Sequence, residues 1–528
     1  MEIPKEIRNI LQNLEKNNFE AYIVGGCVRD LLLLASFDRT TNAAHANIKT
    51  EPKDAQTDSR APKDWDITTN AKPEEIMKVF PNSKYENEFG TVIVKSQKLK
   101  AESTEPEIKA VEVTTYRSEQ GYSDRRHPDE IKFEDSLNKD LERRDFTINA
   151  MAIGHITHNT KRITPKNDSR YALRDTRYAI IDLFGGQKDI KKKIIRAVGE
   201  PVDRFKEDAL RMMRAIRFSV QLGFEIEPKT ERAIIKLAGA IKFVSKERIH
   251  NELVKILQSD KPAEGILLLQ KTKLLQYIIP ELENCVGVKQ NKHHTYTVFK
   301  HAVESLRHIK NKEYQVRLAS LLHDIGKPKA KDGKGEEATF HNHEYAGAKI
   351  TKKIMERLKF SRDDIDRVTN LIRHHMFYYN TDEVTAASVR RLINKVGKEN
   401  LQDLIDLRVA DRLGSGTPKA MPYKLRHLQY MMEKVQNDPV SVKMLKINGD
   451  ELMPLLKIKP GPKIGAILEV LLAEVIEDPE LNNKKHLEKR SKELNKMELE
   501  ELRVKAKDVI QEKREIDDSK MKRGFYVK

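Results

Sequence analysis

The chain has few of the residues that cross-link small proteins or span membranes. Only two cysteines occur, Cys27 and Cys285, which cannot build a disulfide framework and indicate a reducing compartment. No apolar run approaches the roughly 20 residues that a membrane helix needs. The first residues, MEIPKEIRNILQNLEKN, have the periodicity of an amphipathic helix rather than of a signal peptide. The sequence therefore predicts a cytoplasmic protein and argues against a secreted disulfide scaffold or a membrane protein.

Acidic residues are also in short supply relative to basic ones. The 98 Lys and Arg residues outnumber the 81 Asp and Glu residues, which gives a net charge of +17. This excess predicts an anionic partner, most simply a nucleic acid, and a general bias toward solubility is the alternative. The length of 528 residues is enough for about two to four domains.

The two parts of the chain differ in the periodicity of their apolar residues. Up to about residue 200, short apolar runs predict strands that end in turns: AYIVGG, GTVIVKS, KAVEVTTY and YAIIDLFGG. From about residue 201 onward the apolar spacing is helical, as in EDALRMMRAIRFSVQLGF and ERIHNELVKILQ. Three polar stretches, 38–62, 96–109 and 155–177, predict surface loops or insertions.

Two further stretches lie near the C-terminus. Residues 447–475 predict two helices joined by a Pro/Gly turn. That turn could present backbone amides to an RNA phosphate, and a plain helix–helix connection is the alternative. Residues 481–528 are rich in Lys and Glu with few apolar positions, which predicts a solvated helix or a partly disordered tail.

The single tryptophan stands between two aspartates, in KDWDITTN. In a strand, Asp64 and Asp66 would share one face and Trp65 would point to the other, buried face. Two carboxylates this close repel each other, and a cation between them would relieve the repulsion. The pattern by itself is compatible with a metal site, but a polar strand edge anchored by an aromatic residue is the commoner alternative, so the rest of the chain has to decide between them.

A pair of glycines, Gly25 and Gly26, follows a predicted strand and precedes a helix that carries Arg29 and Asp30. Such a turn brings backbone N–H groups and a helix N-terminus against a phosphate, although many glycine pairs are turns only. A third carboxylate, Glu112, alternates with Val111 and Val113, which face the core. Three acidic residues on two strands beside such a turn suit two-metal phosphoryl transfer.

Five motifs follow one another in the order GGCVRD…DWD, YRSEQGYSDRRHPDEIKF, RRDFTINAMA, DLFGG and EDALRMMRAIRF. In this order they resemble the motifs of class II tRNA nucleotidyltransferases, a family that comprises CCA-adding enzymes and bacterial poly(A) polymerases. The resemblance spans about residues 20–290. It implies an α+β protein, with an N-terminal nucleotidyltransferase head on a small mixed β-sheet and an all-α neck, body and tail.

The resemblance also implies roles for individual residues. Asp64 and Asp66 would hold catalytic Mg²⁺ ions, and Glu112 would assist as a third carboxylate. Residues of the glycine turn and of RRDFTINAM would meet the ribose and phosphates of the nucleotide. The residues expected there are Gly25, Gly26, Arg29, Asp30, Arg143, Arg144 and Asp145.

The motif EDxxR selects the nucleotide base in this family, and here it consists of Glu207, Asp208 and Arg211. Three positions apart on one predicted helix, Asp208 and Arg211 would share a face, where one accepts and the other donates a hydrogen bond to a base edge. A simple ion pair is the alternative. Arg214 and Arg217 continue that face and could touch phosphate.

The sequence departs from the family pattern in one respect, since family members usually place D-x-D much closer to the glycine turn. The polar stretch 38–62 intervenes here. Because VRDLLL and KDWDIT are intact on either side, we interpret it as a tolerated loop insertion.

Histidines gather between residues 290 and 412, on segments with helical periodicity. They include the adjacent pair His323-Asp324, together with His301, His343, His375 and the later Asp411. Imidazoles and carboxylates that converge from several helices suit a divalent transition metal.

This set resembles the ligand order H…HD…D of the HD phosphohydrolase domain. The resemblance implies that His301, His323, Asp324 and Asp411 bind a metal such as Mn²⁺, Ni²⁺, Co²⁺ or Fe²⁺. His343 and His375 would complete a second metal position or contact phosphate. His294 is a weaker candidate for a phosphate contact.

The function expected from both resemblances is template-independent addition of CCA to the tRNA 3′ end from CTP and ATP, with a second phosphohydrolase activity. In the family, a flexible loop after the third carboxylate is linked to the switch from C to A, and residues 116–133 correspond to it. Bacterial poly(A) polymerase is the alternative, as is an HD phosphohydrolase whose degenerate head only binds RNA. The oligomeric state stays open.

The expected domains follow from these motifs. They are the head at 1–200, a helical neck at 201–285, the HD domain at 286–415, an RNA-binding body or tail at 416–480 and the charged tail at 481–528.

Overall fold

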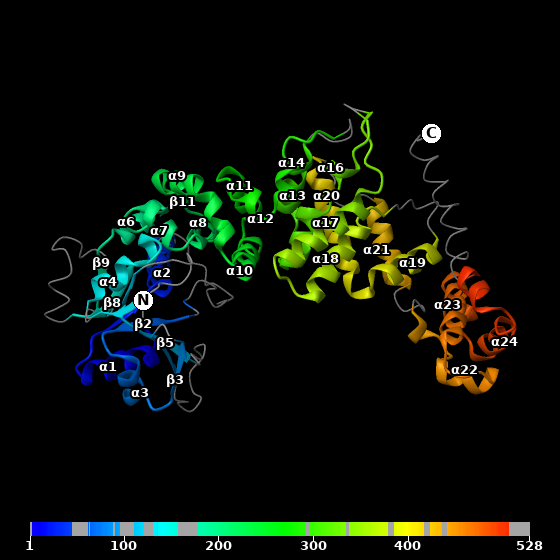
Figure 1. Ribbon diagram of the computed structural model, residues 1–528, viewed down its shortest axis with the longest axis horizontal. Coiled ribbons are helices and arrows are strands. Elements are labelled where there is room, and N and C mark those ends of the chain that lie inside the picture. Colours follow the sequence, from blue (N-terminus) through cyan, green and yellow to red (C-terminus); the bar gives the residue numbers. More distant parts are fainter. Residues whose placement is uncertain are drawn as a thin grey trace. The chain divides into compact units, whose positions relative to one another are not determined.

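A computed structural model of the chain (Figure 1) has two compact units, Met1–Pro280 and Glu281–Lys528, each of which is described by itself. The structure describes residues 3–44, 62, 64–87, 90–95, 110–120, 130–134, 136–156, 178–290, 296–333, 337–377, 385–416, 423–435 and 441–505.

A seven-stranded mixed sheet forms the centre of the first unit. In spatial order its strands are β3 (Ser83–Asn87), β4 (Thr91–Lys95), β5 (Ala110–Thr115), β2 (Asp66–Thr69), β1 (Ala21–Val24), β8 (Met151–His155) and β9 (Tyr178–Asp182). Strands β2 and β5 are parallel, and the other neighbouring pairs are antiparallel. A separate hairpin consists of β6 (Arg117–Gln120) and β7 (Glu130–Phe133).

The register of β2 against β5 brings two acidic residues together at the middle of the sheet. Asp66 lies directly opposite Glu112 in this parallel pair. Along β5, Val111 and Val113 are buried whereas Glu112 is exposed, as the alternation of side chains in a strand predicts. The same alternation holds before β2, where Trp65 is buried and Asp64 is exposed.

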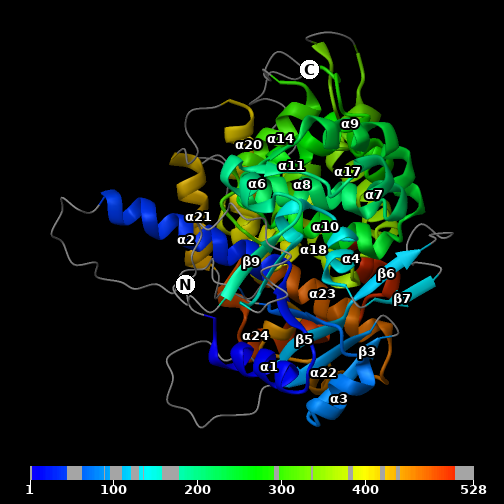
Figure 2. The same ribbon diagram turned by 90° about the vertical axis from the view of Figure 1, so that its left-hand side faces the viewer.

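In the described part of the first unit, helical segments of 3 to 19 residues surround the sheet. They are α1 (Lys5–Lys16), α2 (Gly26–Ala44), α3 (Pro73–Val79), α4 (Leu137–Glu142), η2 (Thr147–Asn149) and α6 (Gly186–Lys192). Figures 1 and 2 both show α1 and α3 together beside the strands, and α2 packs on β1 and β8. Helix α1 buries Ile7, Ile10, Leu11 and Leu14, whose spacing places them on one face.

The strands predicted from the apolar runs are confirmed as β1, β4, β5 and β9. The prediction of a loop over 38–62 is wrong for its first part, because α2 continues to Ala44. No glycine or proline occurs after Gly26 within this helix, so nothing interrupts its backbone hydrogen bonds. Most of the remaining stretch, all of 96–109 and most of 155–177 lie outside the described residues.

The first unit ends in a helical region. Its elements are β10 (Ile194–Ile195), α7 (Pro201–Glu207), α8 (Leu210–Leu222), β11 (Glu225–Ile226), α9 (Pro228–Leu237), η3 (Ala238–Phe243), α10 (Lys246–Leu257), α11 (Pro262–Lys271) and α12 (Leu275–Ile278). The short helix α13 (Pro280–Glu283) spans the boundary between the two units. Helix α8 packs against α10 and α11, and it ends at Gly223, whose φ of 69° suits glycine. The shift from strands to helices near residue 200 is confirmed.

The second unit is helical throughout its described part. Its first helices are α14 (Val298–His308), α15 (Tyr314–Leu322), α16 (Lys327–Ala330), α17 (His343–Arg357), α18 (Arg362–His374), α19 (Ala386–Val396), η5 (Lys398–Asn400), α20 (Leu401–Gly414) and α21 (Tyr423–Val435). The pairs α14–α20, α17–α18 and α15–α18 pack against one another. An all-α region after a mixed-sheet head confirms the predicted α+β fold.

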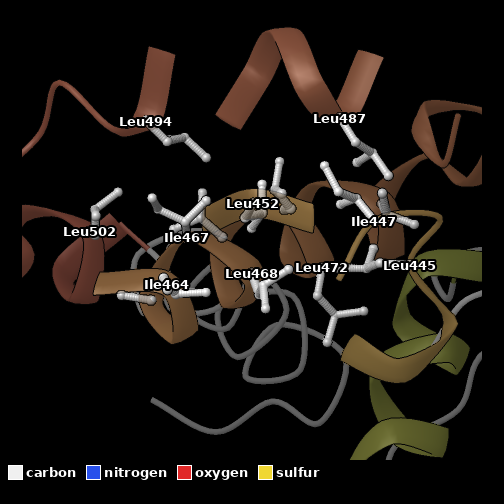
Figure 3. Packing of buried hydrophobic residues seen from close by; sticks show 14 of the residues in the cluster. Leu445, Ile447, Leu452, Ile464, Ile467, Leu468, Leu472, Leu487, Leu494 and Leu502 are labelled. Carbon is white, nitrogen blue, oxygen red and sulfur yellow. The ribbon is translucent and has the colours of Figure 1, made fainter. Parts of the chain in front are cut away.

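The end of the described chain has a hydrophobic core of its own (Figure 3). Its elements are η6 (Val442–Met444), α22 (Gly449–Leu456), α23 (Pro462–Glu477), η7 (Pro479–Leu481) and α24 (Lys484–Leu494). The predicted helix, turn and helix over 447–475 are confirmed as α22 and α23.

The prediction of a solvated tail over 481–528 is wrong for the residues up to 505. Leu487, Leu494 and Leu502 are buried against α22 and α23, as Figure 3 shows. These leucines are seven and eight positions apart, so one apolar side chain per two turns is enough to attach this Lys/Glu-rich segment. Residues 506–528 lie outside the described part. Among the described residues, no helix has both the length and the apolar character that crossing a membrane requires.

Candidate active sites

The glycine turn at residues 25 and 26 is in close contact with two predicted site residues. Gly25 has a φ of +85°, and α2 begins at Gly26. A Cβ atom at Gly25 would lie 3.1 Å from the Nη1 of Arg144 and 3.3 Å from the Oδ2 of Asp66. Because only glycine combines this backbone conformation with so little space, the turn keeps Asp66 and Arg144 beside the N-terminus of α2.

Burial and neighbouring carboxylates raise the pKa of two of the three predicted carboxylates, Asp66 and Glu112. Burial raises the pKa of Asp66, Arg144 opposes this, and the charge of Asp64 adds to it. The pKa of Glu112 is also raised, first by burial and then by Asp66 and other carboxylates that include Asp64. Such mutual repulsion favours a cation beside these oxygens, and oxygen ligands fit Mg²⁺. Within the described residues, however, three ligand atoms come within 4.8 Å of one another only in the second unit.

A buried aspartate that the sequence analysis missed holds the arginines of the RRD motif. Asp140 contacts Arg143 at 2.6 Å and Arg144 at 3.1 Å. Although burial opposes it, the two guanidinium groups lower the pKa of the Asp140 carboxyl below its usual value. Asp145 in turn pairs with Arg214 at 2.6 Å. The spacing of Asp140 three and four residues before the arginines on a short helix was the available signal.

The EDxxR motif has a different geometry from the one predicted. Helix α7 ends at Glu207, α8 begins at Leu210, and Asp208 between them has an extended backbone with φ −141° and ψ 105°. The prediction that Asp208 and Arg211 share a face of one helix is therefore wrong. The Asp208 side chain accepts a hydrogen bond from the backbone N–H of Leu210, the first residue of α8, and this bond favours a turn between the two helices.

Each member of this motif has its own partner. The Oδ2 of Asp208 accepts a hydrogen bond from Arg248 at 2.6 Å. Arg211 pairs with Glu207 at 2.5 Å and donates to the backbone carbonyl of Arg143. Arg248 comes from α10 and was not predicted, because no feature of the surrounding sequence ERIHNELV indicates a contact with residue 208.

A cavity of about 390 Å³ collects most of the predicted nucleotide-binding residues. Six arginines and three aspartates line it, so it suits an anion such as a nucleoside triphosphate. Two donors on its wall, the Nε of Arg144 and the Nη1 of Arg248, are buried without a hydrogen-bond partner among the described residues. The lining residues are Gly25, Gly26, Arg29, Asp66, Arg143, Arg144, Asp145, Asn149, Asp208, Leu210, Arg211, Arg214, Phe218 and Arg248.

Five predicted residues are not part of this lining. Asp64 and Glu112 neighbour Asp66, which lines the cavity, but they do not line it themselves. Asp30 pairs with Arg29 at 2.8 Å. Glu207 pairs with Arg211. Arg217 is buried and pairs with Glu252 at 3.1 Å, so the structure gives it a packing contact instead of a place on the cavity wall.

The predicted histidines and aspartates of the second unit converge in a buried cluster. Nε2 of His301 lies 3.0 Å from Nε2 of His323 and 3.2 Å from Oδ1 of Asp411. Nε2 of His343 lies 3.4 Å from Nε2 of His375. These residues come from α14, the end of α15, the start of α17, the end of α18 and α20, so tertiary packing brings them together.

Asp324 connects two groups of ligand atoms within this cluster. Its Oδ2 lies 3.3 Å from both His301 and His323, and its Oδ1 lies 3.2 Å from His343 and 3.8 Å from His375. Both possible three-ligand groups in the described residues therefore contain this aspartate. One carboxylate shared by two groups is the arrangement that bridges two metal ions.

The donor set fits divalent transition metals. The Nδ1 atoms of His323, His343 and His375 lie 2.7–2.8 Å from the backbone carbonyl oxygens of Ser320, Phe340 and Ile372. Donation of the Nδ1 proton to these oxygens leaves each Nε2 as an acceptor directed into the cluster. Although burial lowers it, Asp324 and Asp411 raise the pKa of His323 to about 10. The cluster therefore attracts positive charge, which a bound cation would supply.

A buried lysine that the sequence analysis did not assign also contacts this cluster. The Nζ of Lys327 lies 2.6 Å from the Oδ2 of Asp324 and donates to the side chain of Gln290. Its position three residues after Asp324 was a signal for this contact. His294 lies outside the described residues.

Gly326 lets α16 and α17 approach closely beside the cluster, and we expect Gly326→Ala to disturb it. The added Cβ would overlap the carbonyl oxygen of His343 and would lie 2.6 Å from the backbone nitrogen of Gly347. Such overpacking should destabilise the protein by about 1–3 kcal/mol and weaken metal binding. Thermal denaturation and metal analysis measure both effects.

Gly465→Ala is the matched control. Gly465 is exposed within α23, and nothing lies within 4 Å of the Cβ that the substitution adds. It should raise stability by up to about 1 kcal/mol and leave metal content unchanged. Equal effects of both substitutions would show that the α16–α17 contact is unimportant.

Three segments of the chain match known families. Residues 21–196 match the family described as "Poly A polymerase head domain", residues 223–286 match "Probable RNA and SrmB- binding site of polymerase A", and residues 292–415 match "HD domain".

Two relatives and one solved structure extend this similarity over most of the chain. The A-adding tRNA nucleotidyltransferase of Deinococcus radiodurans is 35% identical over 353 residues, which are 64% of this chain and 74% of that protein. The chain belongs to the tRNA nucleotidyltransferase and poly(A) polymerase family, and it carries an HD domain. The CCA-adding enzyme of Ligilactobacillus salivarius is 30% identical over 93% of this chain and 98% of that enzyme.

The structural comparison agrees with this family. The crystal structure of the Bacillus stearothermophilus CCA-adding enzyme in complex with CTP superimposes with a TM-score of 0.59 at 25% identity, covering 94% of this chain and 98% of that one. The predicted resemblances to the nucleotidyltransferases and to the HD domain are thus both confirmed. The roles of individual residues stay predictions.

Proposed function

We propose that this nucleotidyltransferase adds C, C and A to the 3′ end of tRNA without a template, using CTP and ATP. The observation that carries the proposal is the head cavity, which joins the glycine turn, a carboxylate of D-x-D, and Asp208 and Arg211 of the EDxxR motif in one space. Its size of about 390 Å³ suits one nucleotide. The similarity to CCA-adding enzymes over nearly the whole chain supports the same substrate.

In this mechanism the head residues bind and orient the triphosphate. Backbone N–H groups at Gly26 and the N-terminus of α2 meet its phosphates, together with the arginines that Asp140 holds in place. Mg²⁺ bound by Asp64, Asp66 and Glu112 would activate the attacking oxygen and neutralise the phosphates. The RNA 3′-hydroxyl forms a bond to the α-phosphorus, and the bond to pyrophosphate breaks.

Hydrogen-bond acceptors and donors that line the same cavity would recognise the base. Asp208 offers a carboxylate, and Arg211 and Arg248 offer guanidinium groups. The Nη1 of Arg248 has no hydrogen-bond partner among the described residues, so it could donate to the base. Because Asp208 lies between two helices, a small rotation at this junction would change the pattern of donors and acceptors. The proposed switch from C to A therefore involves the α7–α8 junction as well as the segment 116–133, of which 121–129 lie outside the described residues.

Discrimination between nucleotide bases should decrease when one of these cavity residues is removed. Asp208→Ala, Arg211→Ala and Arg248→Ala should each reduce discrimination against UTP and GTP by about 1–3 kcal/mol, the range of a bidentate base contact. Incorporation of each labelled nucleotide into tRNA that ends before CCA measures this effect.

Arg232→Ala, on the exposed surface of α9, is the matched control and should leave base choice unchanged. If Arg248→Ala retains wild-type discrimination while Asp208→Ala loses it, Arg248 only supports the fold of the junction.

A second candidate function is the addition of A alone, which the similarity to the Deinococcus A-adding enzyme favours. The incorporation assay separates the two, since an A-adding enzyme extends only tRNA that already ends in CC. A poly(A) polymerase would instead extend unrelated RNA with long adenosine tails.

We also propose that the HD domain is a metal-dependent phosphohydrolase. The buried cluster with Asp324 shared between two groups supports this proposal. His301, His323, Asp324, His343 and His375 would hold divalent transition ions, whose positive charge would make water a better nucleophile and would polarise the phosphate. Lys327, beside Asp324, would hold the negative charge of the phosphoryl group.

The same proposal assigns a separate function to each region of the chain. The head at 1–200 and the neck at 201–285 would transfer nucleotides, the region 286–415 would hydrolyse phosphate, and the region 416–480 would bind RNA. The hydrophobic core that joins α22, α23 and α24 supports extending this last region to about residue 502.

A further inference from the structure

Three arginine side chains surround the aromatic ring of Phe218 on α8. The Cζ atom of Arg217 lies 4.3 Å from the centre of this ring, that of Arg29 5.3 Å and that of Arg214 5.4 Å. Phe218 is 7% exposed and lines the head cavity together with Arg29 and Arg214. An aromatic residue therefore lies among three positive charges, two of which line the space proposed for the triphosphate.

The residues around this ring come from different parts of the first unit. Arg29 lies near the start of α2, directly after the glycine turn, whereas Arg214 and Arg217 lie on α8 with Phe218 itself. The ring also meets Phe146 edge to face, with the two ring centres 5.7 Å apart and the ring planes at 82°. Phe146 directly follows the RRD motif. Phe218 therefore connects the helical region with both phosphate-binding motifs of the head.

The guanidinium groups around the ring repel one another. Burial lowers the pKa of Arg217, and Glu252 opposes this. The positive charges of Arg214 and Arg29 lower it further. The Nε of Arg217 lies 3.1 Å from Glu252, but it is buried without a hydrogen bond to any described residue. Hydrogen bonds therefore do not fully compensate the positive charge that is gathered here.

The ring supplies an attraction that opposes this repulsion. The faces of an aromatic ring carry partial negative charge, and a planar guanidinium group stacks well on them, most strongly where water is excluded. The two cavity arginines also donate hydrogen bonds, from Nε of Arg214 to Asp145 at 2.7 Å and from Nη1 of Arg29 to Asn149 at 2.8 Å. The ring and these two acceptors together restrict where the guanidinium groups can lie.

We propose that Phe218 is a positioning residue of the nucleotidyltransferase site, whose ring holds the guanidinium groups of Arg29 and Arg214 toward the triphosphate. The inference rests on the proposed binding of nucleotides in the head cavity. Phe218 acts through the two arginines and not on the reacting atoms. Because every nucleoside triphosphate carries the same phosphates, the ring affects CTP and ATP equally and leaves base choice unchanged.

The test varies the charge of the ring faces at nearly constant size. In the full-length protein, Phe218 is replaced by phenylalanine that carries one, two or three ring fluorines, each of which weakens the attraction for a cation. The KM for each nucleotide that the protein uses should rise stepwise, to about tenfold with three fluorines, while kcat stays within about threefold. Phe218→Leu keeps apolar bulk without a ring and should raise the KM at least as much.

A probe without a base isolates the contact with phosphate. Inorganic tripolyphosphate should inhibit nucleotide addition in competition with CTP and ATP. Its inhibition constant should rise in parallel with the KM through the fluorinated series. Discrimination against UTP and GTP should stay at the wild-type level in the same proteins.

Phe205 provides the matched control, since it is fully buried on α7 and does not line the cavity. The same fluorinated residues at this position measure the general effect of fluorine on a packed core. They should leave the KM for the nucleotides and the inhibition by tripolyphosphate within about twofold of the wild type.

Three results would overturn the role of Phe218. They are a wild-type KM throughout its fluorinated series, an equal rise in the Phe205 series, and a rise that is the same for one fluorine as for three, which would indicate size instead of charge. In each case the wild-type protein would still add nucleotides. If the wild-type protein incorporates no nucleotide at all, the proposed function fails and the role of Phe218 fails with it.

Discussion

Nucleotide addition should fall at least about a thousandfold in Asp66→Asn, because the substitution removes the charge beside the glycine turn that a catalytic metal needs. Asp66 lies opposite Glu112 and next to Asp64, so its carboxylate is central among the three. Incorporation of labelled CTP and ATP into tRNA without its 3′ end measures the loss. RNA binding should persist, since it depends on the distributed positive charge.

The same variant should be no less stable than the wild type. Burial raises the pKa of Asp66 in the folded protein, so the folded state binds this proton more tightly than the unfolded state does. The ionised carboxylate therefore opposes folding once the pH exceeds its unfolded pKa, and the neutral amide removes that cost. An unchanged or higher melting temperature together with lost activity would separate catalysis from folding.

Asp203→Asn is the matched control, since this aspartate is exposed on α7. It should retain full activity. Asp64→Asn should also abolish addition, although Asp64 is more exposed. Incorporation near the wild-type rate by Asp66→Asn would refute the metal assignment in the head.

Removing the charge of Asp324 should empty the HD cluster of metal and end phosphoester hydrolysis. Its two oxygens face the two histidine groups, so Asp324→Asn should lower bound metal from about two ions per chain to nearly none. The double change His323→Ala with Asp324→Ala should have the same result. Metal analysis of the purified protein and hydrolysis of p-nitrophenyl phosphate with added Mn²⁺ or Ni²⁺ measure the effects.

Substitution of single histidines tests the two groups of metal ligands separately. His301→Ala should lose one ion and His343→Ala the other, because these residues belong to different groups. His341→Ala, an exposed neighbour of α17, should lose neither. Nucleotide addition should stay within about twofold in every case, because the head lies in a different unit.

Two findings would contradict this assignment. If His301→Ala and His343→Ala each release all metal, the cluster holds one ion and Asp324 does not bridge. If the wild-type protein neither binds metal nor hydrolyses any phosphate probe, the domain has no hydrolase activity.

The sequence by itself determined the features that depend on short spacing. Alternation along a strand placed Trp65 inside and Asp64 outside, and the glycine pair marked the turn before α2. The order of the motifs identified the family and predicted the head, the helical remainder and the HD ligands. These features rest on local backbone geometry or on a motif within a few residues, so the linear sequence contains them.

Three features were decided only by the tertiary structure. Asp208 lies between two helices, where its carboxylate accepts hydrogen bonds from the Leu210 backbone N–H and from Arg248, which lies 40 residues later. Leu487 attaches a charged segment to a core because α22 and α23 leave an apolar face open to it. Asp324 connects the two ligand groups because four helical segments direct histidine ring nitrogens to its two oxygens. Each depends on which distant atoms meet, and the spacing of residues along the chain does not specify that.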